Sequence, residues 1–250
     1  MIDKLNLVSI ISKYHLNGMI EAVRWDIKDQ NLSIGFNSPS KEMIGNLEFT
    51  GFPLEDSTIA LSNTSQLNKL ISITNGYVEL SYKKQHNLIT KLILSDNNYT
   101  LDYSLADLML VPRAGGLQME PNFTEISELD NESIGAIVKA KGALVDTDTV
   151  VIRPNPNDDG EDRVEMCFGG NIEHSNKVSF FLSDVNISEV FKQLDKPDLP
   201  HYNSNMIKEI MYCNKDMVSG TMSIDLEGIM KLEFTGDNLK SSYYLVSKEK

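Results

Sequence analysis

The chain has 250 residues, of which 41% are hydrophobic, 24% charged and 8% aromatic. This is the composition of a globular protein, so it excludes a disordered or collagen-like chain, and the length suits one large domain or two of about 125 residues. The formal net charge of −13 argues against a generic basic nucleic-acid binder, although an acidic chain can still carry a local basic surface.

Cellular location follows from the cysteines and the apolar runs. Two cysteines, Cys167 and Cys213, are too few for a disulfide framework, so we expect free thiols in a reducing compartment. Polar residues interrupt the N-terminal apolar stretch, which therefore does not resemble a signal peptide, and no run approaches the roughly 18 apolar residues of a membrane span. We expect a cytoplasmic protein that is not secreted and has no membrane partner.

Four segments carry apolar residues at the spacing of one side of a helix, as Leu7, Ile10, Ile11 and Tyr14 do in the first. The expected helices span residues 4–15, 64–74, 131–141 and 187–196. Their expected N-caps are Asp3 for the first, Asn63 or Thr64 for the second and Asp130 for the third, and Pro197 ends the last. Each stripe is one-sided, so each helix should lie on a sheet with its other side free.

Most of the remaining chain predicts short strands. Runs rich in apolar, β-branched or aromatic residues lie at 19–27, 32–36, 44–52, 77–82, 88–94 and 99–104, with Asn, Asp and Gly between them. Asp96-Asn97-Asn98 predicts a hairpin turn between the last two runs.

The order of elements repeats, because each half runs helix, strands, helix, strands and a closing hairpin. The helices recur at a nearly constant offset and the closing hairpins at a larger one, which predicts an insertion at residues 197–216. Within it, residues 205–213 are either an additional helix or an extended loop. We therefore predict an α+β protein of two similar tandem domains, 1–107 and 126–250, each an antiparallel sheet with two helices on one face. A connector, residues 108–125, joins them and contains the turn-forming Pro112, Gly115, Gly116 and Pro121.

The four expected helices are basic although the whole chain is acidic. Against Glu132, Glu189 and Asp195 they carry seven lysines: Lys4, Lys13, Lys69, Lys139, Lys141, Lys192 and Lys196. One interpretation is that lysines simply favour exposed helix faces. The other is a surface that faces phosphates, where lysine acts as a point charge and contacts are non-specific and salt-dependent. No arginine lies in these segments, so base reading by bidentate arginine is not expected.

Three stretches carry a resemblance to sliding clamps, the processivity factors of replicative DNA polymerases. They are TIALSNTSQLNKLISITNGYVELSY (58–82), TEISELDNESIGAIVKAKGALVDTDTVVIRP (124–154) and MKLEFTGDNLKSSYYLVSK (230–248). With the tandem domains and the basic helices, they make the chain similar to clamps of the T-even phage type and, more distantly, to proliferating cell nuclear antigen. The resemblance covers nearly the whole chain as an order of elements and includes no catalytic motif.

The resemblance implies a non-enzymatic protein that forms a homotrimeric ring of six domains. Helices would line a hole for duplex DNA, the seven lysines would face its backbone, and edge strands of neighbouring subunits would pair. The ring would be placed on DNA by a clamp loader, slide without reading sequence, and tether the DNA polymerase at high effective concentration. A phage origin would place it in the cytoplasm of a bacterial host.

The resemblance also implies a pocket beneath the connector for a partner peptide. Its expected residues are Met43, Ile44, Val111, Pro112, Leu117, Ile229, Tyr244 and Val246. The alternative is that the strand residues of this set belong to the core. The connector residues are the stronger candidates, because apolar side chains in an exposed crossing need a reason.

No catalytic residue, metal site or cofactor is expected. The four histidines, His15, His86, His174 and His201, have no partner at metal-ligand spacing, and no glycine-rich phosphate loop is present. Two other functions stay open. An oligomeric phage or viral structural protein of tandem β-rich domains would not explain basic helices in both halves, and a hydrolase would need a His, Cys or Ser constellation that the sequence lacks.

Overall fold

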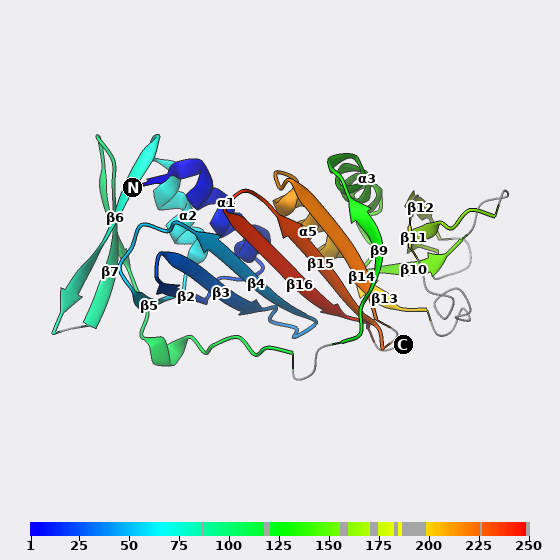
Figure 1. Cartoon of the computed structure of the whole chain (residues 1–250), viewed down its shortest axis with the longest axis horizontal. Helices are drawn as coiled ribbons and strands as arrows, with labels where there is room; N and C mark the ends of the chain where they lie inside the picture. The colour runs from blue at the N-terminus through cyan, green and yellow to red at the C-terminus, as the bar shows by residue number, and fades with distance from the viewer. Residues whose placement is uncertain are drawn as a thin grey trace. The chain divides into compact units, whose positions relative to one another are not determined.

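The computed structural model describes residues 1–86, 88–117, 121–155, 160–170, 175–182, 185–186, 199–225 and 227–248. It divides into two compact units, Met1–Gly116 with Asp237–Ser241, and Leu117–Gly236 with Ser242–Lys250. Each unit is built mainly of antiparallel strands and contains a few helices (Figure 1). The predicted α+β class is confirmed.

The first unit contains two sheets, two helices and two short 3₁₀ turns. Its first sheet has the order β5-β2-β3-β4, from β2 (Val23–Lys28), β3 (Asn31–Asn37), β4 (Met43–Thr50) and β5 (Ser57–Leu61). Its second sheet has the order β1-β6-β7-β8, from β1 (Ile2–Asp3), β6 (Tyr77–Gln85), β7 (Leu88–Ser95) and β8 (Thr100–Ser104). The helices are α1 (Lys4–His15) and α2 (Thr64–Ser72), and the turns are η1 (Leu16–Gly18) and η2 (Leu108–Leu110).

Side-chain caps fix where the first two helices begin. The Asp3 carboxylate accepts a hydrogen bond from the backbone N–H of Leu5 at 2.8 Å, and the Asn63 side chain accepts one from Gln66 at the same distance. Each cap satisfies a backbone donor that has no partner inside its helix. The apolar stripe of α1 is fully buried against α2 and β4, as its spacing predicts.

The second unit repeats this plan. One sheet has the order β9-β14-β15-β16, from β9 (Thr124–Leu129), β14 (Ser219–Ile224), β15 (Ile229–Thr235) and β16 (Leu239–Val246). The other has the order β12-β11-β10-β13, from β10 (Thr149–Pro154), β11 (Val164–Gly169), β12 (Lys177–Leu182) and β13 (His201–Asn203). The helices are α3 (Asn131–Gly142), capped by Asp130 as predicted, and α5 (Ser204–Asn214).

Helix α5 settles what the expected insertion contains. The Asn203 side chain accepts hydrogen bonds from the N–H groups of Asn205 and Met206, so it caps the helix. Buried Met206, Ile207 and Ile210 follow at helical spacing, and α5 packs on α3. The open choice between helix and loop for residues 205–213 is therefore decided for the helix. The helix expected at residues 187–196 lies outside the described residues.

Gly45 provides a test of packing in the first unit. A Cβ built on this β4 glycine would lie 2.1 Å from the ring of buried Phe36. We expect Gly45→Ala to lower the free energy of unfolding by about 1 to 3 kcal/mol, because the aromatic ring has to move within a packed core. Chemical denaturation of this variant beside Gly116→Ala, where an added Cβ meets no atom within 4 Å, is the measurement. Equal losses in both variants would contradict the packing argument.

Candidate nucleic-acid interface

The described helices differ in which lysines they expose. Lys69 on α2 and Lys139 on α3 are exposed to solvent. Lys4 is half-buried, and its ammonium group donates hydrogen bonds to the backbone oxygens of Ser72, at 2.8 Å, and Thr74. The ammonium group thus satisfies backbone acceptors at the C-terminal end of α2. These hydrogen bonds would compete with a contact between Lys4 and a phosphate.

Two of the seven lysines do not lie on an exposed helix face, so the expectation of exposure is wrong for them. Lys13 is fully buried and Lys141 is 3% exposed. The Lys141 ammonium donates to the backbone oxygens of Leu144 and Val145, both at 3.0 Å, beyond the end of α3. Burial, and then the charge of nearby Lys208, lowers the pKa of Lys141. Neither ammonium is available to a ligand on this surface.

Helix α5 supplies basic residues that the sequence analysis missed. Asn205, Lys208 and Tyr212 of this helix, and Lys215 at its C-cap, recur every three or four residues on the side away from the core. Lys208 is half-buried and the others are exposed. Lys208 pairs with Glu209 at 3.2 Å. Lys192 and Lys196, placed on a helix by the sequence, lie outside the described residues. On the described helices and their caps, the exposed lysines are therefore Lys69, Lys139 and Lys215, and Lys4 and Lys208 are half-buried.

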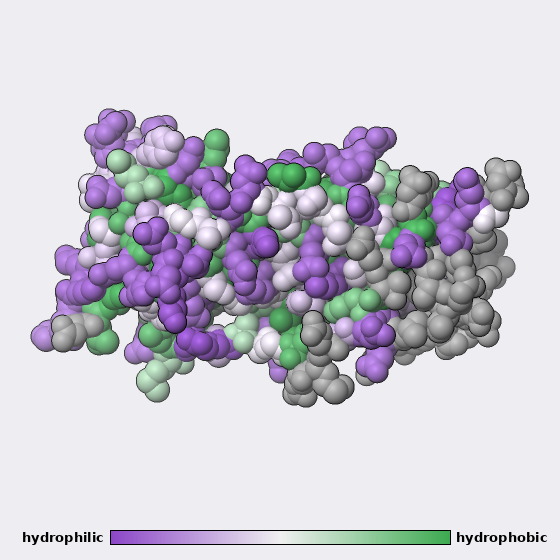
Figure 2. All heavy atoms as spheres, in the orientation of Figure 1, coloured by the Kyte–Doolittle hydropathy of each residue, from purple (hydrophilic) through white to green (hydrophobic). Residues whose placement is uncertain are grey.

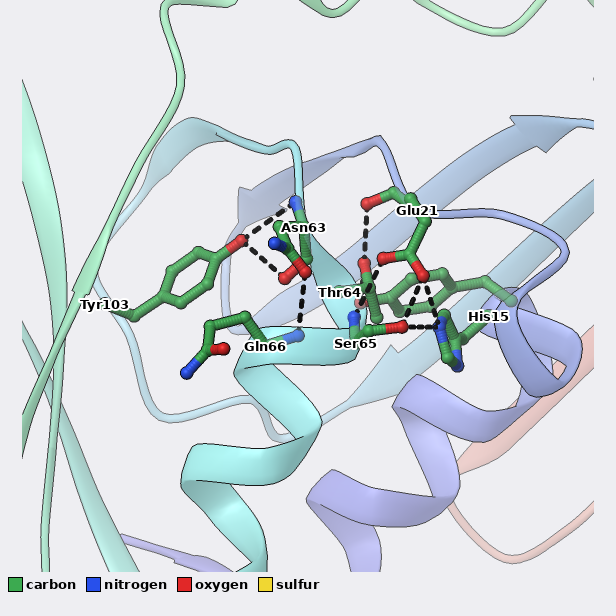
Figure 3. A network of polar contacts seen from close by, with 8 residues as sticks. His15, Glu21, Asn63, Thr64, Ser65, Gln66 and Tyr103 are labelled. Carbon is green, nitrogen blue, oxygen red and sulfur yellow. Dashed lines mark hydrogen bonds and ion pairs between the residues drawn. The ribbon is translucent and has the colours of Figure 1, made fainter.

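A polar network closes the N-terminus of α2 (Figure 3). The Thr64 N–H donates to the Glu21 backbone oxygen at 3.1 Å, the Ser65 N–H donates to the Glu21 carboxylate at 2.9 Å, and the Gln66 N–H donates to Asn63. Tyr103 both accepts from the Asn63 N–H and donates to its backbone oxygen. These donors are already used, so α2 offers a lysine rather than its N-terminus to an anion.

His15, Glu21 and Ser65 meet in this network but do not form a catalytic triad. The His15 Nε2 atom lies 3.2 Å from the Glu21 carboxylate and 3.1 Å from the Ser65 hydroxyl, so one ring nitrogen serves both contacts. A triad needs the acid and the hydroxyl on different ring nitrogens. Here the Ser65 hydroxyl donates directly to the Glu21 carboxylate. Burial raises the pKa of Glu21, but hydrogen bonds from Ser65 and His15 outweigh it and leave this pKa lowered. The network joins α1 to α2.

In the first unit, the connector is fixed at its beginning. The Arg24 guanidinium donates to the backbone oxygens of Val111 and Leu108, and Arg113 pairs with Asp26 at 3.2 Å. Ala114 lies against β3, where a Cβ on Gly35 would be 3.3 Å from its own Cβ. The connector therefore crosses the face of β2 and β3 that is turned away from the core.

The expected pocket residues of the first unit divide between core and surface. Met43 is fully buried and Val111, in the connector, is 3% exposed, so neither side chain is open to a partner peptide and the expectation that they are accessible is wrong. Ile44, on the opposite face of β4, is half-buried, and Pro112 is exposed. In the connector shortly before Pro112, the side chains of Met109 and Leu110 are 89% and 78% exposed. Met109 and Leu110 belong to the expected connector but are not among the expected pocket residues.

In the second unit, the expected residues Ile229, Tyr244 and Val246 share the solvent side of β15 and β16. The centre of the Tyr244 ring lies 6.0 Å from the centre of the Phe123 ring. The Lys231 ammonium lies 5.6 Å from the centre of the Phe123 ring and 5.8 Å from that of Tyr244. Val246 is 47% exposed, and Ile229, Tyr244 and Leu117 are half-buried. This aromatic and aliphatic cluster can receive an apolar side chain. Lys231 beside it is already paired with Glu233 at 2.7 Å.

Within the described ranges, no three or more His, Cys, Asp or Glu side chains are placed to hold a metal ion. Among the same residues, no helix has the length and apolar character needed to cross a membrane. Hydrophilic residues cover most of the described surface in the view of Figure 2, with small hydrophobic patches between them.

Comparisons with known proteins find a match in structure only. No protein-family model matches the chain, and no curated protein matches it in sequence. The proliferating cellular nuclear antigen of Entamoeba histolytica superposes with a TM-score of 0.74 at 16% identity, over 99% of this chain and 96% of that one.

Two further structures give similar values. A. fulgidus PCNA, solved with the C-terminal region of FEN-1 bound to it, has a TM-score of 0.73 at 14% identity, over 100% of this chain and 97% of that one. The PCNA2–PCNA3 complex of Sulfolobus tokodaii gives 0.71 at 12%, over 99% and 98%. The resemblance to sliding clamps is therefore confirmed for the fold: along its whole length, this chain has the fold of PCNA.

Proposed function

We propose that this chain is a sliding clamp, a non-enzymatic ring that encircles duplex DNA, slides without reading sequence and tethers a DNA polymerase. The observation that carries the proposal is a PCNA fold over the whole chain at TM-scores of 0.71 to 0.74. Exposed Lys69 and Lys139 and half-buried Lys208, on three described helices, support it, because point charges make weak, mobile contacts to phosphates. A clamp loader would place the ring on DNA.

The ring would be a homotrimer joined through edge strands. β8 and β12 each end a sheet, with five and six residues, whereas the other edges of those sheets, β1 and β13, have two and three. A long edge strand is a template for pairing with another chain, and ring closure removes it. We infer that β8 of one subunit pairs with β12 of the next.

Partner proteins would dock through short apolar segments. The A. fulgidus clamp is described as binding the C-terminal region of FEN-1. In this chain, the cluster of Tyr244, Ile229 and Val246 in the second unit and the exposed Met109 and Pro112 in the first are surfaces of suitable chemistry. The DNA polymerase would use such a segment.

Light scattering at several protein concentrations tests the ring. We expect the mass of three chains of 28.1 kDa each, unchanged down to low micromolar concentration. Phe181→Asp in β12, where the side chain is 37% exposed, should lower that mass, because a carboxylate would be buried at the joint. Val218→Asp, at a 76% exposed position outside both edge strands, is the control. A wild-type protein that is strictly monomeric would contradict the encircling mechanism.

A further inference from the structure

The free side of α5 differs from a plain lysine surface because it carries a tyrosine. Tyr212 is 45% exposed and lies between Lys208 and Lys215, at four and three residues from them. The Lys215 ammonium lies 4.4 Å from the centre of the Tyr212 ring. The half-exposed Tyr212 ring is therefore in direct contact with one of the two lysines that flank it on this side of the helix.

The contact between these two side chains positions both of them. The face of an aromatic ring attracts a cation, so the ring holds the flexible lysine near one place. A lysine ammonium has three N–H donors, and the ring face satisfies none of them with a strong acceptor. The phenol O–H of the same ring is a second type of donor. One exposed unit therefore presents a positive charge together with a neutral hydrogen-bond donor.

We propose that Tyr212 and Lys215 bind one phosphate group of duplex DNA together, the ammonium by charge and the phenol by a hydrogen bond. The proposal rests on the proposed clamp function, in which the helices face DNA. Tyrosine hydroxyls and lysines are both common donors to DNA phosphates. Two acidic residues, Glu209 and Asp216, lie near Tyr212 and Lys215 in the sequence. The ion pair of Glu209 with Lys208 is partly exposed, so Lys208 can readily exchange the carboxylate for a phosphate.

The two side chains should leave different signatures in the salt dependence of binding. A lysine that neutralises a phosphate releases a counterion, so Lys215→Ala should reduce the slope of log affinity against log salt by about 1 for each phosphate that the ammonium neutralises. Tyr212→Phe keeps the ring and removes a neutral donor. It should weaken binding about fivefold, the effect of one net hydrogen bond, and leave the slope unchanged.

The experiment is fluorescence anisotropy of a labelled duplex, titrated with full-length protein at several salt concentrations. The matched controls are Tyr99→Phe, at a 44% exposed tyrosine in the β7–β8 turn, and Lys240→Ala, at an exposed position of β16. Neither control should change affinity or slope. Lys215→Arg should keep the wild-type slope, because the charge remains.

The outcomes separate this inference from the proposed function. If the wild-type protein does not bind duplex DNA at any salt concentration, the clamp function itself is contradicted. If the wild type binds and Tyr212→Phe equals Tyr99→Phe, Tyr212 contacts no phosphate and the inference is wrong. A loss of slope in Tyr212→Phe would also overturn it, because the hydroxyl would then be needed for the charge contact of Lys215 and would not act as a separate neutral donor.

Discussion

Replacing Lys69, Lys139 and Lys208 together by glutamate is expected to weaken binding to duplex DNA at least about 100-fold, with the fold and the oligomeric mass unchanged. Each change turns an attraction to phosphate into a repulsion, and each phosphate that is no longer neutralised lowers the salt slope by about 0.9. The three residues lie on α2, α3 and α5. Because their side chains are open to solvent to different degrees and none fills the core, the fold should tolerate the changes.

The matched control alters net charge by the same amount elsewhere. Lys28, Lys41 and Lys240 are exposed on strands or turns, so their triple change to glutamate tests general repulsion between an acidic protein and DNA. Anisotropy of a labelled duplex measures both variants, and light scattering verifies their mass. If the control loses as much affinity as the helix variant, the helices are not the DNA-facing surface. The helix variant does not include Lys141, because this lysine is buried. Its replacement by glutamate would lower the stability of the fold as well as the affinity for DNA.

Helix spacing predicted three helices well and also shows why Lys141 was misplaced. Apolar positions and caps give α1, α2 and α3 nearly to the residue. On α3, however, Lys141 follows Ile134 by seven residues, so it lies on the same stripe as Ile134 and Ile137. Spacing alone therefore indicates that Lys141 is buried. A total of charges over a whole helix does not separate its buried side from its exposed side, so it does not reveal this burial.

Helix α5 was predicted only as one of two alternatives, for a different reason. The assumption of a constant offset between the halves placed the second helix of the second domain at residues 187–196 and treated the following residues as an insertion. Local signals for α5 were present, since Asn203 is a good N-cap and Met206, Ile207 and Ile210 have helical spacing.

The connector's path depended on Arg24, which holds Val111 and Leu108 from a distant strand, and no local pattern reveals such a contact.

The second large effect is expected at Glu165, where Glu165→Ala should destabilise the second unit by about 3 kcal/mol. Glu165 on β11 is 1% exposed, and its carboxylate accepts hydrogen bonds from Arg153 and Asn155, both at 2.7 Å, and from Ser179. Lys177 lies 3.0 Å away. Removing the carboxylate leaves two cations and two polar donors with no acceptor, and breaking a buried pair costs about 3 to 5 kcal/mol. Arg153 and Lys177 are partly exposed, which favours the lower end.

The pH dependence gives an independent measure of the same group. Burial raises the pKa of Glu165, but hydrogen bonds from Arg153, Ser179, Asn155 and Lys177 outweigh it and bring the pKa from 4.5 to about 2. Because the folded value is depressed, the stabilisation is complete above pH 4.5 and is lost as the pH falls toward 2. A shift of this size is worth about 3 kcal/mol. Glu165→Gln should remove this part of the decline in stability when urea unfolding is compared at about pH 7 and about pH 3.

An exposed ion pair serves as the control. Asp102 on β8 pairs with Lys91 at 2.8 Å, and both side chains are open to solvent, so Asp102→Asn should leave the unfolding free energy nearly unchanged. If Glu165→Ala behaves like Asp102→Asn, the buried cluster does not stabilise the sheet.

The cluster around Glu165 also affects the proposed ring, because Lys177 and Ser179 are both residues of edge strand β12. Glu165→Gln should therefore make the light-scattering mass fall on dilution near neutral pH, even where each chain stays folded.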